Sequence, residues 1–491
     1  MLAPARYLWA SLEQKTGLTK KDFIALLSKN LGFEPTAGQL SLFHQLTDYF
    51  SGKENNHVFV VRGYAGTGKT SIVRSLVKTL PQTSLRTVLL APTGRAAKVL
   101  AAYSGQTAYT IHKKIYFTQG GDAGMSFALQ RNLHKRTVFI VDEASMIGGE
   151  NNETEHNLLS DLLEYVINGD QCRLILIGDT AQLPPVGLDE SPALDSEQLR
   201  KKYYLEVDES RLDEVMRQRL ESGILWNATE IRKQLESGES AFPKLVTEGF
   251  SDVKAITGLE LEDSLNAAYD KYGTEEVLVI TRSNKTANLF NKQIRARIRW
   301  QEDELSAGDH LMVVKNNYFW LPETSGPGFI ANGDTLQIQR LGRQYDREGF
   351  RFADASVSFI DYSEESNLDV KVLINTLDVD QASMPYAEQK KLFALIEEDY
   401  MDIRNKRDRM KQMRKDPFIN ALQVKFAYAV TCHKAQGGQW KCVFVDQGYL
   451  TEEMLDTNYL RWLYTAVTRA SEKLYLVNFN DKFFGIEDET F

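Results

Sequence analysis

The chain has 491 residues, of which 43% are hydrophobic and 25% are charged. This length exceeds the roughly 250–300 residues at which a single core stops growing, so we expect several domains, and the composition excludes fibrous and intrinsically disordered classes. The formal net charge of −9 excludes indiscriminate binding to nucleic acid over the whole surface. Local binding stays open, because basic residues gather at Arg282 to Arg299 and at Arg404 to Lys415.

The length of the apolar stretches and the spacing of the cysteines indicate where in the cell the protein resides. No stretch approaches the ~18 apolar residues of a membrane span, and the first residues lack the basic-then-apolar pattern of an export signal. The three cysteines, Cys172, Cys432 and Cys442, show neither a disulfide framework nor paired metal-ligand spacing. We therefore expect a cytoplasmic protein without membrane contact and without a zinc site.

The chain begins with helical patterns. Residues 1–34 predict a small helical extension, in which Phe23, Leu26 and Leu27 recur about one helical turn apart. An amphipathic helix then runs to Phe50, with Thr36 as its N-cap.

Short apolar runs next alternate with helical stretches, at Val58–Val61, Thr87–Leu90, Val138–Val141 and Leu174–Ile177. This alternation is typical of a parallel sheet covered by helices, and ligands of such sheets bind beyond the carboxyl ends of the strands. It predicts an α/β domain at 35–204. An insertion at 104–136 interrupts this domain, because strand-like runs flank a glycine-rich segment and predict a β-hairpin with arms at 113–118 and 126–130.

The second half repeats the buried-strand signal, at Val277–Ile280, Val443–Val445 and Leu474–Val477. Because these runs lie far apart in the sequence, they predict a second α/β domain at 205–334 and 425–491, split by an insertion. The insertion at 335–424 combines alternating runs of small-barrel type with one highly charged helix at about 386–413.

The segment Gly63–Thr70 reads Gly-x-x-x-x-Gly-Lys-Thr between a predicted strand and a predicted helix. Its glycines let consecutive backbone N–H groups face an anion, while Lys69 reaches the β- and γ-phosphates and the Thr70 hydroxyl holds Mg²⁺. The residues expected to bind the nucleotide here are Gly63, Ala65, Gly66, Thr67, Gly68, Lys69 and Thr70.

Two further strand ends carry groups suited to nucleotide hydrolysis. Asp142 and Glu143 end the third run, so Asp142 can hold Mg²⁺ through water and Glu143 can act as the general base. Gln182 follows the fourth run, where a neutral amide can sense the γ-phosphate. The developing charge also requires arginine, and the candidates are Arg217 and Arg469, both in the second domain.

Eight segments stand in a recognisable order: Gln39, Gly63–Thr70, Ala91–Lys98, Asp142–Met146, Gly178–Val186, Arg217–Gln218, Thr431–Gly437 and Tyr464–Arg469. Together they resemble superfamily 1 DNA helicases, most closely the RecD-like and phage Dda-like branch that moves 5′ to 3′. The resemblance covers about 35–334 and 425–491. It implies two RecA-like domains, with an SH3-like β domain in the insertion, here enlarged by the charged helix.

The resemblance also implies roles for individual residues. Gln39 would contact adenine, Gln436 and Gly437 would lie beside the nucleotide, and Arg217 and Arg469 would reach the γ-phosphate. The implied contacts with single-stranded DNA are Pro92, Thr93, His112, Thr431 and His433.

These observations predict an ATP- and Mg²⁺-dependent DNA helicase that works as a monomer on single strands and at single/double-strand junctions. A nucleotide-gated DNA-binding switch and a 3′-to-5′ helicase are the alternatives; the hydrolytic set argues against the switch, and only the branch resemblance gives the direction. Phe117, expected near the hairpin tip with Tyr116 on the opposite face, is our candidate for a wedge that contacts DNA at the junction. Alternatively, Phe117 anchors the hairpin to the core.

Overall fold

The structure is a computed structural model that describes residues 18–52, 56–121, 124–148, 157–215, 221–239, 241–321, 329–360 and 367–485. Its first sheet has six parallel strands in the order β3-β2-β6-β7-β1-β8. They are β1 (His57–Gly63), β2 (Arg86–Ala91), β3 (Ala108–Thr110), β6 (Thr137–Val141), β7 (Arg173–Gly178) and β8 (Glu206–Leu212). All four predicted runs form strands of this sheet.

Helices cover both faces of the first sheet. They are α2 (Lys20–Leu31), α3 (Ala37–Ser51), α4 (Lys69–Thr79), α5 (Gly94–Ser104), α6 (Ile111–Ile115), α7 (Leu158–Ile167) and α8 (Ser196–Tyr203). Side chains alternate along β1, so that Phe59 and Val61 pack with α2 to α5 while Val58 and Val60 pack with α6 to α8. Each face therefore has its own core.

Two expected boundaries of this domain are wrong. The sheet continues beyond residue 204 into β8, an edge strand whose alternating burial leaves one face polar, so it lacks an apolar run. The helical extension is not separate either, because Phe23 and Leu27 of α2 are fully buried in the same core as α3 and α4.

The predicted hairpin is present as β4 (Tyr116–Gly121) and β5 (Gly124–Leu129). The insertion starts later than expected, because β3 pairs with β2 in the main sheet and α6 follows it. Phe117 pairs with Ala128, one rung from the base, whereas Gly121 and Gly124 form the last rung. The expectation that Phe117 lies near the tip is therefore wrong.

The second sheet has five parallel strands in the order β16-β10-β17-β18-β9. They are β9 (Val253–Ile256), β10 (Val277–Thr281), β16 (Ala429–Thr431), β17 (Trp440–Asp446) and β18 (Ala470–Val477). Its helices are α9 (Gly223–Ser237), α10 (Leu261–Tyr272), α11 (Asn284–Gln293), α14 (Cys432–Ala435) and α15 (Thr457–Val467). Because β10 pairs with both β16 and β17, the two distant parts of the chain form one sheet, as predicted.

The segment between these parts contains a closed five-stranded barrel. Its strands are β11 (His310–Val313), β12 (Thr335–Arg347), β13 (Phe350–Phe359), β14 (Leu368–Leu373) and β15 (Leu422–Phe426). The barrel thus includes a strand that precedes the expected boundary at 335. The single charged helix is a wrong prediction: it is two helices, α12 (Tyr386–Glu398) and α13 (Lys406–Met413), because Asn405 N-caps the second through its side chain.

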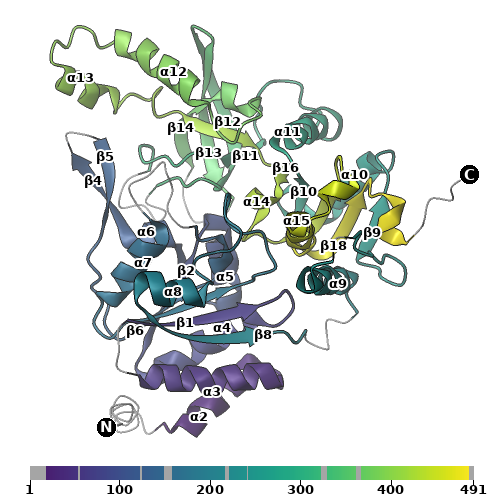
Figure 1. Ribbon diagram of the computed structural model, residues 1–491. Helices are drawn as coiled ribbons and strands as arrows, with labels where there is room; N and C mark the ends of the chain where they lie inside the picture. The colour runs from purple at the N-terminus through teal and green to yellow at the C-terminus, as the bar shows by residue number, and fades with distance from the viewer. Residues whose placement is uncertain are drawn as a thin grey trace, which may run out of the picture.

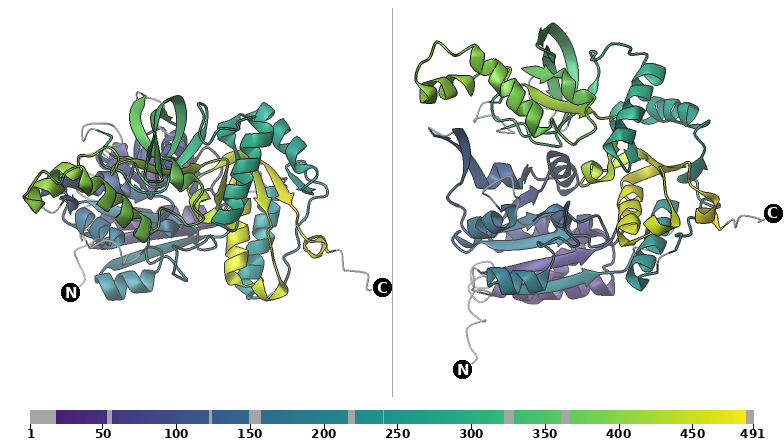
Figure 2. Two further views of the ribbon diagram at one scale, coloured as in Figure 1. Left: turned by 90° about the horizontal axis from the view of Figure 1, so that it is seen from above. Right: turned by 45° about the horizontal axis from the view of Figure 1, so that its top comes forward.

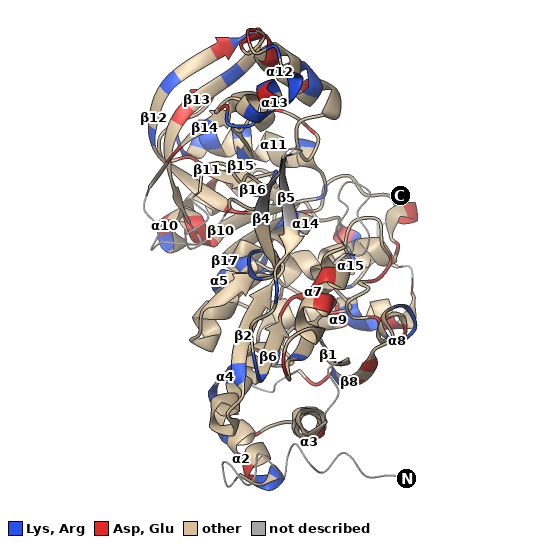
Figure 3. Cartoon of the chain, turned by 90° about the vertical axis from the view of Figure 1, so that its left-hand side faces the viewer, with Lys and Arg blue, Asp and Glu red and all other residues tan. Residues whose placement is uncertain are grey.

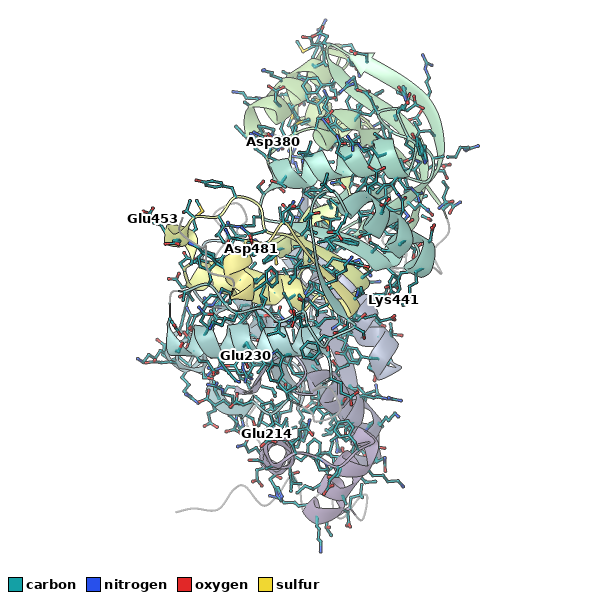
Figure 4. The ribbon with its side chains drawn as sticks, turned by 90° about the vertical axis from the view of Figure 1, so that its right-hand side faces the viewer. Glu214, Glu230, Asp380, Lys441, Glu453 and Asp481 are labelled. Carbon is teal, nitrogen blue, oxygen red and sulfur yellow. The ribbon has the colours of Figure 1, made fainter. Side chains whose placement is uncertain are left out.

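The three parts follow one another in space. The first sheet lies below, the second sheet lies beside and above it, and the barrel lies on top, with α12 and α13 projecting from the barrel (Figures 1 and 2). Seen from the right-hand side of Figure 1, α9, which carries the labelled Glu230, lies between the first domain and the rest of the second (Figure 4). None of the helices within the described ranges is long and apolar enough to cross a membrane.

Candidate functional site

The phosphate-loop segment connects β1 to α4 through a tight turn. Gly66 and Gly68 have φ of +80° and +89°, in the left-handed region that favours glycine. A Cβ on Gly63 would lie 3.0 Å from Thr67 Oγ1, so a side chain there would crowd the loop. The glycines that the motif requires are therefore also the residues that the turn requires.

Lys69, the first residue of α4, lies at the centre of the loop. Its Nζ donates to the carbonyl oxygens of Gly63 and Tyr64 at 2.6 and 3.0 Å, and it lies 3.7 Å from Asp179 Oδ2. The ammonium group thus stands where a phosphate on the loop would meet it.

A cleft of about 990 Å³ opens over this loop between the two α/β domains. This volume is at the upper end of the roughly 300–1,000 Å³ typical of ligand sites. The predicted residues that line it are Ala65, Gly66, Gly68, Lys69, Thr70, Asp142, Glu143, Gln182, Gly437 and Arg469. Residues far apart in the sequence therefore meet at one site, as expected.

Two carboxylates stand at the end of β6. Asp142 accepts hydrogen bonds from the Tyr103 hydroxyl and, at 2.9 Å, from the Glu143 backbone N–H. Glu143 has φ of +54°, a strained conformation for a residue with a side chain. Burial raises the pKa of Glu143, and Arg469 opposes that rise. A buried carboxylate with a raised pKa is a stronger base than an ordinary surface carboxylate.

Gln182 is only 5% exposed, and its Oε1 has no hydrogen-bond partner among the described residues. A buried acceptor without a donor costs about 1–3 kcal/mol. Because Gln182 lines the cleft, a donor bound there, such as a water beside a phosphate, would satisfy it. This orphaned oxygen fits a bound nucleotide.

Tyr464 of α15 links the two domains across the cleft. Its hydroxyl accepts from the backbone N–H of Ala65 in the phosphate loop at 2.8 Å and donates to Asp179 Oδ2 at 2.7 Å. Tyr464 is 1% exposed and Asp179 is fully buried. The sequence alone assigns no role to Tyr464, Asp179 or Tyr103, although the first two lie within the recognised segments.

Further hydrogen bonds cross between the domains, and two of them involve Leu183. Leu183 N–H donates to Thr465 Oγ1 at 2.8 Å, and Gln436 Nε2 donates to the Leu183 carbonyl at 2.6 Å. Gln436 does not line the cleft; it holds the domains together beside it.

Gln39 is also placed behind the cleft wall. Its Nε2 donates to the Thr67 carbonyl at 3.0 Å, and its Oε1 accepts from the N–H of Thr36, which N-caps α3, at 3.1 Å. Gln39 is 1% exposed. It therefore braces the phosphate loop from behind.

The two predicted arginines differ in what the structure shows. Arg469 is 3% exposed and lines the cleft, and its guanidinium donates to the carbonyls of Thr465 and Gly438 at 3.0 and 3.2 Å. Arg217 lies outside the described residues.

The two segments expected to grip a single strand meet between the domains. A Cβ on Gly437, which has φ of +73°, would lie 2.9 Å from Ala96 Cβ and 3.3 Å from Thr93 Oγ1. Of the expected strand contacts in these segments, Pro92, Thr93 and Thr431 are half-buried and His433 is exposed.

The β4–β5 hairpin begins close to His112, which is also expected to contact single-stranded DNA. The His112 ring lies 5.8 Å from that of Tyr116, and burial lowers the pKa of His112 to about 4, so this side chain is neutral at neutral pH. Tyr116 is buried and donates to Asp161 Oδ2 of α7 at 2.6 Å. Phe117 is 47% exposed. The two aromatic side chains therefore face opposite ways, as predicted, and Tyr116 is the anchor.

The metal ligands expected with the nucleotide are Thr70 and Asp142, and both line the cleft. Within the described ranges, no group of three or more histidine, cysteine, aspartate or glutamate residues could hold a metal ion. One hydroxyl and one carboxylate fit Mg²⁺, which in nucleotide sites takes its other ligands from phosphates and water.

Comparison with known families gives two matches, to the AAA domain at residues 36–250 and to the UvrD-like helicase C-terminal domain at residues 426–477. An uncharacterised protein of Acanthamoeba polyphaga mimivirus is 24% identical over 489 residues, which cover 87% of this chain and 96% of that protein. The ATP-dependent DNA helicase dda of Enterobacteria phage T4 is 27% identical over 287 residues, covering 57% of this chain and 60% of dda.

A third relative is the ATP-dependent RecD2 DNA helicase of Deinococcus radiodurans, which is 34% identical over 135 residues; these cover 27% of this chain and 16% of that protein. The matches thus span less than two thirds of either named helicase. Both family matches fall where the two parallel sheets lie, in the order that the motifs predict. These matches confirm the resemblance to superfamily 1 helicases of the RecD-like and Dda-like branch.

Proposed function

We propose that this protein is an ATP-dependent DNA helicase that moves 5′ to 3′ along single-stranded DNA and unwinds duplex. The observation that carries the proposal is the cleft between the domains, where Lys69, Glu143 and Arg469 line one space. The resemblance to superfamily 1 DNA helicases and the named helicase relatives support the choice of DNA as the track.

In the proposed mechanism, the residues of the first domain bind the nucleotide and activate the attacking water. The phosphate loop and Lys69 hold the β- and γ-phosphates, and Glu143 takes a proton from the attacking water. The raised pKa of Glu143 favours this transfer. Bound Mg²⁺, with Thr70 and Asp142 as its protein ligands, would neutralise phosphate charge and orient the phosphates.

The second domain would supply positive charge to the transition state and would move relative to the first domain. Arg469 would stabilise the transition state from across the cleft, and Arg217 is the second proposed donor. Because Tyr464, Gln436 and Leu183 tie the domains together beside the cleft, nucleotide binding and domain closure are linked. Segments 91–98 and 431–437 would hold the DNA strand. Opening and closing of the two domains over this strand would then move a monomer along it in steps.

Two alternatives predict different results. A nucleotide-gated switch would bind DNA and ATP without rapid turnover, although the assembled Glu143, Gln182 and Arg469 argue against it. A 3′-to-5′ helicase would have the same cleft but the opposite tail preference.

The test uses purified Lys69→Ala and Glu143→Gln variants. Lys69→Ala should lose ATP turnover because the phosphates lose their cation, and Glu143→Gln should lose turnover yet still bind ATP, because it lacks only the base. ATPase is measured with and without single-stranded DNA, and thermal unfolding checks the fold. Near-normal turnover in either variant, or no stimulation of the wild type by DNA, would overturn the proposal.

A further inference from the structure

One basic surface has no role in the proposed function. It lies on the arm, which we define as residues 385–416, containing α12 and α13 and projecting from the barrel (Figure 1). Figure 3 shows blue segments on α13 at the outer end of the molecule. Among residues 404–415 Asp408 is the single acidic residue, in a chain of net charge −9. The basic residues in this segment are Arg404, Lys406, Arg407, Arg409, Lys411, Arg414 and Lys415.

Several acidic groups of the arm are used internally. Glu397 accepts from Arg409 Nε at 2.9 Å, which ties α12 to α13. Asp416 accepts from the Tyr400 hydroxyl at 2.8 Å, and Asp399 pairs with an arginine of β12 at 2.5 Å. The Glu397 contact takes up one basic residue of α13, the Asp399 contact joins the arm to β12, and none of the three involves a lysine of residues 404–415.

The arm also has a rigid base. Ile396 and Met413 are fully buried, and α12 packs on the barrel through Leu392. In contrast, Lys406, Lys411 and Lys415 are exposed, and their side-chain ammonium groups form no hydrogen bond or ion pair with the part of the chain that the structure describes. A fixed scaffold thus presents lysines that serve no contact within it.

The position of the arm indicates which part of a DNA substrate would lie beside it. In Figures 1 and 2 the arm and the β4–β5 hairpin project on the same side of the molecule. If the hairpin stands at the junction where the strands part, the duplex still to be unwound lies beside the arm.

We propose that the basic surface of the arm binds the phosphate backbone of the duplex ahead of the junction. This rests on the proposed helicase function and adds a second DNA site to it. Duplex DNA carries one negative charge per about 1.7 Å, which complements exposed lysines that read no sequence.

The composition of the surface favours duplex over single-stranded DNA. Sites for single strands combine basic groups with aromatic side chains on which bases stack. Residues 404–415 contain no aromatic side chain. The surface offers charge without stacking, as suits a backbone whose bases stay paired.

The test compares two triple variants. The arm variant carries Lys406→Gln, Lys411→Gln and Lys415→Gln. The control carries Lys21→Gln, Lys29→Gln and Lys78→Gln, which remove the same charge from exposed lysines of α2 and α4 at the opposite end of the molecule (Figure 1). Binding to a 5′-tailed duplex and to the tail alone is measured over a range of salt concentrations.

The arm variant should bind the tailed duplex about tenfold or more weakly at low salt, with the slope of log K against log salt reduced by about 2 to 3, since each phosphate contact contributes about 0.9. Its affinity for the tail alone and its DNA-stimulated ATPase should stay within about twofold of wild type, as should both affinities of the control.

Three results would overturn the proposal. Equal losses on the tail and the tailed duplex would make the surface a single-strand site. No loss on either would assign it to an acidic protein partner or to none, and equal losses in the control would show a general charge effect. Failure of the helicase function would appear separately, as a wild type without DNA-stimulated ATPase, while the binding comparison would still report on the arm.

Discussion

The Tyr464 hydroxyl is the most informative single group to remove. It joins the phosphate loop to Asp179 from the other domain, with hydrogen bonds of 2.8 and 2.7 Å in a fully enclosed position. Tyr464→Phe keeps the ring and its packing but leaves the Ala65 N–H and one Asp179 oxygen without their partner. Tyr464 would then be a positioning residue, because it acts through the loop and the aspartate.

The cost follows from the two hydrogen bonds. A buried bond to a charged group contributes about 1.5–3 kcal/mol and a neutral one about 1 kcal/mol, so their loss should cost about 3 kcal/mol. One factor of ten corresponds to about 1.4 kcal/mol, so kcat/KM for ATP at saturating single-stranded DNA should fall about 100-fold. The melting temperature is measured alongside, because Tyr464 packs in a buried cluster shared by the two domains and the loss of its bonds also lowers stability.

Tyr459→Phe is the matched control. Tyr459 lies on the same helix, is 2% exposed, and its hydroxyl has no hydrogen-bond partner among the described residues. Its removal should leave turnover within about threefold of wild type. Equal behaviour of the two variants, or wild-type turnover by Tyr464→Phe, would refute the view that this hydroxyl couples closure to the nucleotide.

Three further predictions concern other parts of the molecule. Arg469→Ala should cut DNA-saturated ATPase by about three orders of magnitude, and Arg469→Lys should rescue poorly because lysine lacks the planar fork; a loss confined to DNA affinity would place this arginine on the strand. Phe117→Ala should slow duplex unwinding about tenfold, since each base step contributes about 1.4 kcal/mol of stacking, while ATPase and single-strand translocation persist; equal loss of all three would return Phe117 to a structural role. Burial lowers the pKa of His310 from 6.5 to about 4, so below about pH 6.5 the unfolded chain takes up a proton that the folded chain refuses. Stability should therefore fall as pH decreases from about 6.5 to 4, by up to about 3 kcal/mol from this group, and denaturant unfolding of His310→Asn should show a smaller fall; an identical pH dependence would contradict the shift.

The parts of the fold that sequence predicts are those in which burial determines the pattern. Strands β1, β6 and β10 are buried on both faces, so each is a short, continuous apolar run that polar residues end. The chemistry of the phosphate loop is equally local, because the turn, the lysine and the threonine are consecutive.

The features that could not be predicted from the sequence depend on neighbouring elements of the fold or on a single side chain. Strand β8 is half polar because it lies at the edge of its sheet, and no apolar run marks it. The break between α12 and α13 depends on one capping side chain, Asn405, within a charged stretch that otherwise reads as helix.

Contacts in the cleft between residues far apart in the sequence could not be predicted from the sequence either. The motif order brought Asp179 and Tyr464 into view, but these residues are separated by 285 positions, and no local pattern shows that they share a hydrogen bond. The bond from Tyr103 to Asp142 likewise arises only when α5 packs over the end of β6.

The central claim is that closure of this cleft on ATP drives movement along one strand in one direction. Strand displacement on duplexes that carry a single-stranded tail at either the 5′ or the 3′ end tests it most directly, with Glu143→Gln as the control without hydrolysis. The wild type should displace the strand only with ATP and only from the 5′-tailed duplex, and Glu143→Gln should displace neither. ATP-dependent displacement from the 3′-tailed duplex would reverse the direction, and binding of both substrates with no displacement would contradict the account in favour of a nucleotide-gated switch.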